Sequence, residues 1–76
     1  MKKEKIIKAL LISQGVSQKV IAERLNVGQT TLNSRINRGN ISVDLLLKIL
    51  DAMNCKLVIV PDSAKLPKEA YEVTTE

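Results

Sequence analysis

Residues 17 to 36 of the chain read SQKVIAERLNVGQTTLNSRI, and this stretch decides the fold. The residue spacing predicts two short helices joined by a tight turn. Ser17 is predicted to cap the first helix, because its hydroxyl can accept a hydrogen bond from a backbone N–H of the first turn. Asparagine tolerates the left-handed backbone conformation, so Asn26 is predicted to end that helix, and Val27 to return to the core. The second helix is predicted over residues 29 to 37.

Helical periodicity indicates which side chains of these two helices point inward. Apolar residues that recur at intervals of three or four lie on one face of a helix, and that face packs against the core. The residues with this spacing are Ile21, Ala22, Leu25, Leu32 and Ile36. Ala22 is small, which allows two helices to cross closely just before the turn.

The opposite face of the second helix is rich in amides and hydroxyls. It consists of Gln29, Thr30, Asn33, Ser34 and Asn37. An amide side chain offers a donor beside an acceptor, which matches the edge of adenine in the major groove. Short hydroxyl side chains let the backbone come close to a ligand. We therefore predict base contacts for these five residues; a polar, solvated face with no recognition role is the alternative.

The same stretch resembles the helix-turn-helix of phage-repressor-type DNA-binding proteins, the Cro-like or XRE family. The family pattern is Ser/Thr-Gln, an apolar-Ala pair, Leu, a turn residue, Val and then the recognition helix. The positions that match it are Ser17, Gln18, Ile21, Ala22, Leu25 and Val27. Two positions depart from it. Gly28 stands where the family usually has serine, and the apolar residue after Leu32 comes four positions later, at Ile36, instead of three.

The resemblance covers roughly residues 5 to 54, and it implies a fold and a function. The implied fold is all-α, a small lambda-repressor-like bundle, here of about four helices. The implied function is sequence-specific binding of double-stranded DNA, with repression of transcription.

Positive charge is concentrated in the half of the chain that contains this motif. The net charge is +4; residues 1 to 40 hold eight Lys or Arg and two acids, whereas residues 41 to 76 hold four and six. A surface that faces DNA phosphates requires such a basic half. We predict phosphate contacts for Gln18, Lys19, Arg38 and Asn40. An ordinary polar surface is the alternative for these residues.

Composition argues against an enzyme and against a metal centre. The chain has no histidine and one cysteine, so neither an internal disulfide nor a Cys/His zinc site can form. No glycine loop for phosphates and no converging pair of carboxylates is present. We predict no catalytic residue, no cofactor and no metal. Cys55 is predicted to be a small buried residue, and its thiol suits a reducing cytoplasm, which is the expected location.

Two further helices are predicted to flank the motif. The N-terminal one runs over about residues 3 to 13, which read as a helix and not as a targeting segment. Nothing in the chain approaches the length of a membrane span. The C-terminal one runs over about residues 43 to 53 and is capped by Ser42. It is apolar over most of its circumference, because Val43 and Leu47 widen its core stripe, so it must be covered on more than one side.

Residues 56 to 60, KLVIV, predict a β-strand that ends at Pro61. A single strand leaves its backbone groups unpaired. We therefore expect it to pair antiparallel with the same strand of a second copy, which would also cover the excess apolar face of the last helix. The predicted homodimer interface is Leu47, Lys56, Leu57, Val58, Ile59 and Val60. A segment packed on its own bundle is the alternative.

Residues 1 to 61 are thus predicted to form one DNA-binding and dimerisation domain, and residues 62 to 76 a mobile tail that is poor in apolar residues. The leading hypothesis is a homodimeric transcriptional repressor that reads an inverted repeat. The alternative is an antitoxin-like module that binds a toxin and regulates its own operon. RNA binding is disfavoured because the basic half lacks aromatic residues for stacking.

Overall fold

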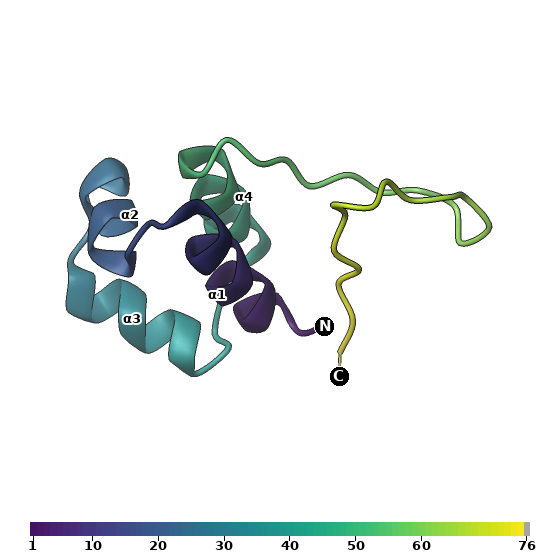
Figure 1. Ribbon diagram of the computed structural model, residues 1–76. Coiled ribbons are helices and arrows are strands. Elements are labelled where there is room, and N and C mark those ends of the chain that lie inside the picture. The colour runs from purple at the N-terminus through teal and green to yellow at the C-terminus, as the bar shows by residue number, and fades with distance from the viewer. Residues whose placement is uncertain (76) are drawn as a thin grey trace.

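The computed structural model describes residues 1–75, and Glu76, the last residue of the predicted tail, lies outside the described residues. Its helices are α1 (Lys3–Gln14), α2 (Gln18–Leu25), α3 (Gln29–Asn37) and α4 (Val43–Ala52). Figure 1 shows α2 and α3 at one end of the molecule, α1 and α4 in the middle, and the C-terminal segment on the other side. The prediction of an all-α bundle is confirmed, with helix ends within one residue of those expected.

The apolar side chains at helical spacing meet in one aliphatic core. The largest side chains that are fully buried are Ile7, Ile21, Leu32, Ile36, Ile49 and Met53. Every helix contributes at least one of them. Burying a side chain of this size stabilises the fold by about 1.5–3 kcal/mol, so this core is the main source of stability for so short a chain.

The expectation that Val27 returns to the core is wrong, because its side chain is 42% exposed. The backbone N–H of Val27 donates to the Ala22 carbonyl at 3.0 Å. This hydrogen bond holds the residue beside the last turn of α2, at the surface, where the side chain packs only in part. The turn is therefore closed by the backbone and not by a buried valine.

All four helices are followed by a residue in the left-handed conformation. These residues are Gly15 (φ 64°), Asn26 (φ 55°), Gly39 (φ 66°) and Asn54 (φ 57°). The next N–H in each case donates to the carbonyl five residues earlier: Val16 to Leu11, Val27 to Ala22, Asn40 to Arg35 and Cys55 to Leu50, at 2.8–3.0 Å. This Schellman arrangement satisfies carbonyls that a helix end leaves unpaired. It also turns the chain sharply, so the helices can pack on one another through short connections.

Serine hydroxyls cap the first turns of α2 and α4, as predicted. The Val20 N–H donates to Ser17 Oγ at 3.3 Å, and the Leu45 N–H donates to Ser42 Oγ at 3.1 Å. Gly28 precedes α3 and has no side chain to do the same. The first turn of α3 consequently presents backbone N–H groups that no side chain caps.

Two side chains from other helices bond the carbonyls at the end of α4. Gln14 Nε2 donates to the Met53 carbonyl at 2.9 Å, and the Arg24 guanidinium donates to the Ala52 carbonyl at 2.8 Å. Gln14 also approaches Cys55 Sγ at 3.7 Å, and this thiol is half-buried against the core. These contacts tie α1 and α2 to the C-terminal end of α4.

The predicted strand over residues 56 to 60 is not formed within the single chain. The described residues contain no β-strand, and in them this segment makes no backbone hydrogen bond. It is not packed on the bundle either, since Val58 and Ile59 are 62% and 98% exposed. The physical reason is that a strand needs a neighbouring edge, and a helical body offers none.

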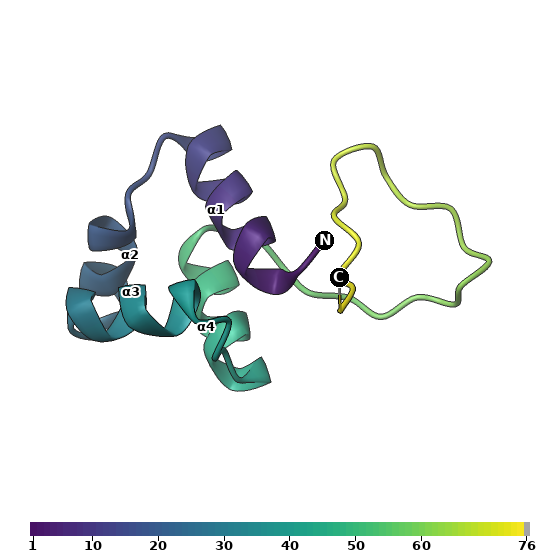
Figure 2. The ribbon, with the colours of Figure 1, turned by 90° about the horizontal axis from the view of Figure 1, so that it is seen from below.

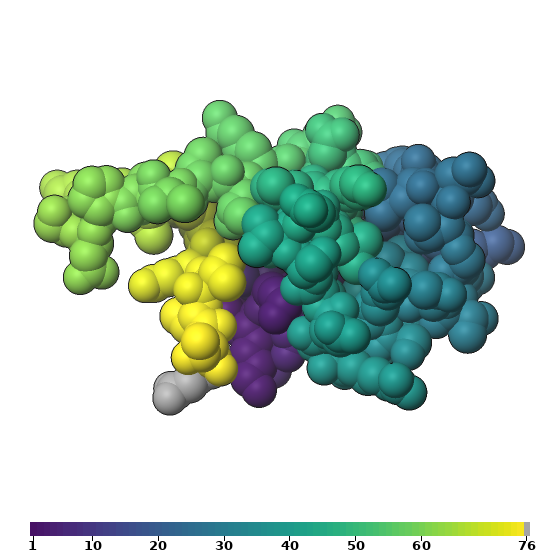
Figure 3. Space-filling view, turned by 180° about the vertical axis from the view of Figure 1, so that it is seen from behind, coloured from purple at the N-terminus to yellow at the C-terminus, as the bar shows by residue number. Residues whose placement is uncertain are grey.

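Beyond Pro61 the chain loops away from the body and returns to the N-terminus (Figure 2). The amino group of Met1 donates to the Glu72 carbonyl at 3.0 Å and to Thr74 Oγ1 at 2.9 Å, and the Thr74 N–H donates to the Met1 carbonyl at 2.9 Å. Seen from behind, the yellow segment that precedes residue 76 lies against the purple N-terminal part of the chain (Figure 3). Residues 61 to 75 are all exposed, and the mobility expected for the tail stays a prediction.

Candidate nucleic-acid interface

The position of α3 is set by two buried side chains. Leu32 and Ile36 are each 1% exposed and anchor the helix to the core. Residues four apart lie on the same face of a helix, so the unusual spacing between them keeps both anchors inward. Because only this face is buried, the remaining surface of α3 is available to a ligand.

The five residues predicted to contact bases all lie on α3. Gln29, Thr30 and Asn37 are exposed, and Asn33 and Ser34 are half-buried. Asn33 differs from the others because its Oδ1 atom is buried and has no hydrogen-bond partner in residues 1–75. An unpaired buried acceptor costs about 1–3 kcal/mol. Base contact by these five residues stays a prediction.

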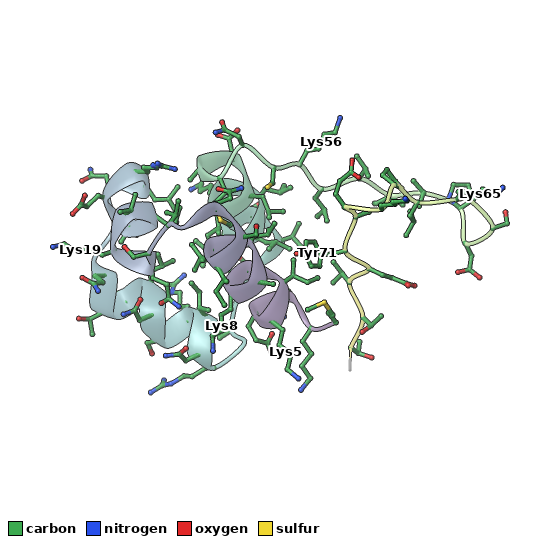
Figure 4. The ribbon with its side chains drawn as sticks, in the orientation of Figure 1. Lys5, Lys8, Lys19, Lys56, Lys65 and Tyr71 are labelled. Atoms are coloured by element: carbon green, nitrogen blue, oxygen red, sulfur yellow. The ribbon has the colours of Figure 1, made fainter. Side chains whose placement is uncertain are left out.

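The residues predicted to contact phosphates lie on both sides of α3 along the chain. Gln18 and Lys19 are in the first turn of α2, whereas Arg38 and Asn40 follow α3 directly. All but the half-buried Gln18 are exposed. Figure 4 shows the Lys19 side chain extending into solvent at the end of the molecule that α2 and α3 form. These positions suit contacts to the DNA backbone beside a recognition helix.

A shallow groove along α3 includes residues that the sequence reasoning missed. It is lined by Thr30, Thr31, Ser34, Arg35, Arg38 and Asn40. Thr31 and Arg35 were not among the residues predicted to contact DNA. Helical spacing could have found them, since Thr31, Arg35 and Arg38 recur at intervals of four and three on one side of α3.

The residues of the predicted homodimer interface are all exposed in the single chain. They are Leu47, Lys56, Leu57, Val58, Ile59 and Val60. Val43, on the same helix as Leu47, is 66% exposed as well. Apolar side chains thus remain uncovered from α4 through the extended segment, as a surface that packs against a partner would require.

Two findings bear on other classes of site. Within residues 1–75, no group of three or more His, Cys, Asp or Glu side chains is arranged so that it could hold a metal ion. None of the helices in this range is long and apolar enough to cross a membrane.

Comparison with known proteins gives a match at the level of the family. A family model described as helix-turn-helix matches residues 7–60, which cover most of α1, all of α2, α3 and α4, and the extended segment. No curated protein and no solved structure matches the chain. The matched range includes the two-helix motif and most of the stretch in which the sequence resembles phage repressors.

Proposed function

The chain belongs to the Cro-like, or XRE, helix-turn-helix family of DNA-binding transcription regulators, and we propose that it is a homodimeric repressor that reads an inverted repeat through α3. The family provides the binding of double-stranded DNA. The contact of α3 with the bases, the homodimer and the repression of transcription are parts of the proposal.

The observation that carries the proposal is the division of α3 into a buried and a polar face. Leu32 and Ile36 are in the core, whereas Thr30 and Asn37 are exposed on the other side. The major groove of B-form DNA is about 12 Å wide and admits one helix. In a helix-turn-helix, the N-terminal residues of the second helix contact base edges. Gln29 is the first residue of α3, so we expect its side chain to contact base edges in the groove.

The uncovered apolar surface supports a dimer. Val43 and Leu47 on α4 and the segment over residues 56 to 60 are exposed. Antiparallel pairing of this segment with its copy would satisfy the backbone groups of both and would bring the two α4 surfaces under cover. A two-fold dimer presents its recognition helices about 34–36 Å apart, one helical turn of DNA. Occupancy of such a site by the dimer would exclude other proteins and repress transcription.

The test is selection of bound sequences from random duplex DNA by the full chain. We expect an inverted repeat whose half-site centres are about one helical turn apart. Gln29→Ala and Asn33→Ala should relax the preference at particular base pairs, at a cost of about 1–3 kcal/mol for each lost contact. Lys19→Ala is the matched control, because loss of a phosphate contact weakens binding to all sequences alike. If both α3 variants select the same sequence as the parent chain, α3 is not the reader.

An antitoxin-like role is the second candidate, and the exposed tail is the observation that favours it. Leu66, Tyr71 and Val73 are large apolar residues that stay exposed beyond the helical body. A toxin could bind there while α3 regulates the operon. A toxin encoded by the neighbouring gene that binds the full chain, but not the chain truncated after Asp62, would establish this role. Equal binding to both chains would exclude the tail as its docking segment.

A further inference from the structure

Arg35 lies on the surface because of the way α3 is anchored. The chain has arginine three positions after Leu32, where the family pattern has an apolar residue. The anchor is instead Ile36, which is 1% exposed. Residues at both i+3 and i+4 lie near residue i on a helix, so α3 can bury Ile36 and leave Arg35 exposed. This spacing places the positive charge of Arg35 on the surface of α3, at a position where the family pattern has an uncharged residue.

The exposed surface of α3 has two chemically different sides. At about 100° per residue, Thr30 and Ser34 form the ridge farthest from the core. One side of that ridge carries the amides of Gln29, Asn33 and Asn37. The other side carries Thr31, Arg35 and Arg38. The helix therefore presents amides on one side and guanidinium groups on the other.

The groove on the cationic side offers hydrogen-bond donors without a carboxylate. Its lining includes the guanidinium groups of Arg35 and Arg38, the hydroxyl of Thr31 and the amide of Asn40. Neither arginine forms an ion pair or a hydrogen bond through its side chain within residues 1–75. Arginine presents five N–H donors in a planar fork that matches the oxygens of a phosphate. The groove thus has the chemistry of a site for an anion with several acceptor oxygens.

The position of Arg35 along α3 favours the DNA backbone over the bases as the source of that anion. In a helix-turn-helix the N-terminal residues of the second helix contact base edges. Arg35 lies in the last turn of α3, away from those residues. Contacts to phosphate and sugar fix the register of a protein on the duplex, and they make up half to two-thirds of protein–DNA hydrogen bonds.

We propose that Arg35 and Arg38 together hold one phosphate group of the DNA backbone and that Arg35 is a positioning residue for α3. This inference rests on the proposed function, since it requires α3 to lie in the major groove. The two guanidinium groups neutralise the same phosphate from the cationic side of the helix. The amides on the other side are thereby held in register with the base edges.

The experiment measures binding of the full chain to its selected DNA and to random duplex DNA over a range of salt concentrations. Arg35→Ala should weaken binding to both DNAs alike, by about tenfold for the loss of a charge-assisted contact. The slope of log K against log salt should fall by about 0.9, which is the change for one phosphate. Arg38→Ala should have the same effect. The double variant should lose less affinity than the sum of the single losses, because both side chains hold one phosphate.

Two further variants sharpen the result. Lys65→Ala removes the same charge at the far end of the exposed C-terminal loop (Figure 4) and should leave the slope unchanged. Arg35→Lys keeps the charge but loses the planar fork, so it should restore the slope and only part of the affinity. Arg35 is exposed, so the melting temperature of every Arg35 variant should equal that of the parent chain.

Two outcomes overturn the inference and leave the proposed function intact. The first is an Arg35→Ala variant with unchanged affinity and slope, while Gln29→Ala still alters the selected sequence. The second is loss of preference at one base pair with an unchanged slope, which would make Arg35 a reader of guanine. If no substitution on α3 affects DNA binding, the proposed function fails together with the inference.

Discussion

The helical body over residues 1 to 55 and the extended segment over residues 56 to 60 contain the same kinds of apolar side chain in opposite surroundings. Ile49 in α4 is fully buried, whereas Ile59, ten positions later, is 98% exposed. Every helix of the body ends in a Schellman turn that satisfies its carbonyls, whereas residues 56 to 60 make no backbone hydrogen bond in the described part of the chain. The helix ends of the body are thus satisfied within the body, whereas the backbone groups of the segment are not satisfied within residues 1–75.

This difference teaches that an apolar pattern predicts the need for a partner surface but does not say which chain supplies it. The apolar stripes of the four helices cover one another. Val43 and Leu47 on the outer side of α4 and the segment beyond it stay exposed within residues 1–75. A second copy offers the same surface and the same strand edge, which is why we propose the dimer.

The largest effect that we expect is on the stability of the body. Ile49→Ala should reduce the free energy of unfolding by about 2–5 kcal/mol, because it removes a buried side chain and leaves a cavity. Ile59→Ala is the matched substitution in the exposed segment. At concentrations where the protein is monomeric, it should change that free energy by no more than about 0.5 kcal/mol. Urea denaturation of both variants tests the comparison, and similar losses would show that Ile59 packs against its own chain.

The next effect concerns the segment in the dimer. Val58→Pro removes a backbone N–H and bends the strand, so it should weaken the dimer at least about tenfold, or 1.4 kcal/mol. DNA affinity should fall with it. Val58→Thr retains the N–H and the branched side chain and should keep most of the dimer. Analytical ultracentrifugation measures how strongly each variant dimerises. A parent chain that is monomeric at micromolar concentration would remove the basis for the strand pairing.

The smallest effect is expected for the tail. Truncation after Asp62 removes the hydrogen bonds that join Met1 to Glu72 and Thr74, which are exposed. Exposed hydrogen bonds contribute little net stability, so the free energy of unfolding should change by less than about 1 kcal/mol and the DNA affinity hardly at all. Figure 4 shows the Tyr71 side chain directed toward the helical body. A fall of many degrees in the melting temperature would mean that this ring packs there.

Much of the fold and part of the candidate site could be predicted from local patterns. The bounds of α3, its anchors Leu32 and Ile36, and the serine caps of α2 and α4 depend on residues within four positions of each other. The amide and hydroxyl residues of α3 follow from the same periodicity. The role that we propose for Arg35 was not predicted, because only the amide and hydroxyl residues of α3 were considered, although Thr31, Arg35 and Arg38 recur at helical spacing.

By itself, the sequence determined the helices, their ends and the inward face of each, because hydrogen bonds within one or two turns and apolar periodicity act over short stretches of chain. Only the tertiary structure decided which side chains complete the end of α4, since Gln14 and Arg24 bond carbonyls 39 and 28 positions beyond them. It also decided that Val27 stays at the surface and that residues 56 to 60 find no edge to pair with in the part of the chain that the structure describes. These outcomes depend on groups far away in the sequence, or in another chain, and no local pattern specifies where such groups come to lie.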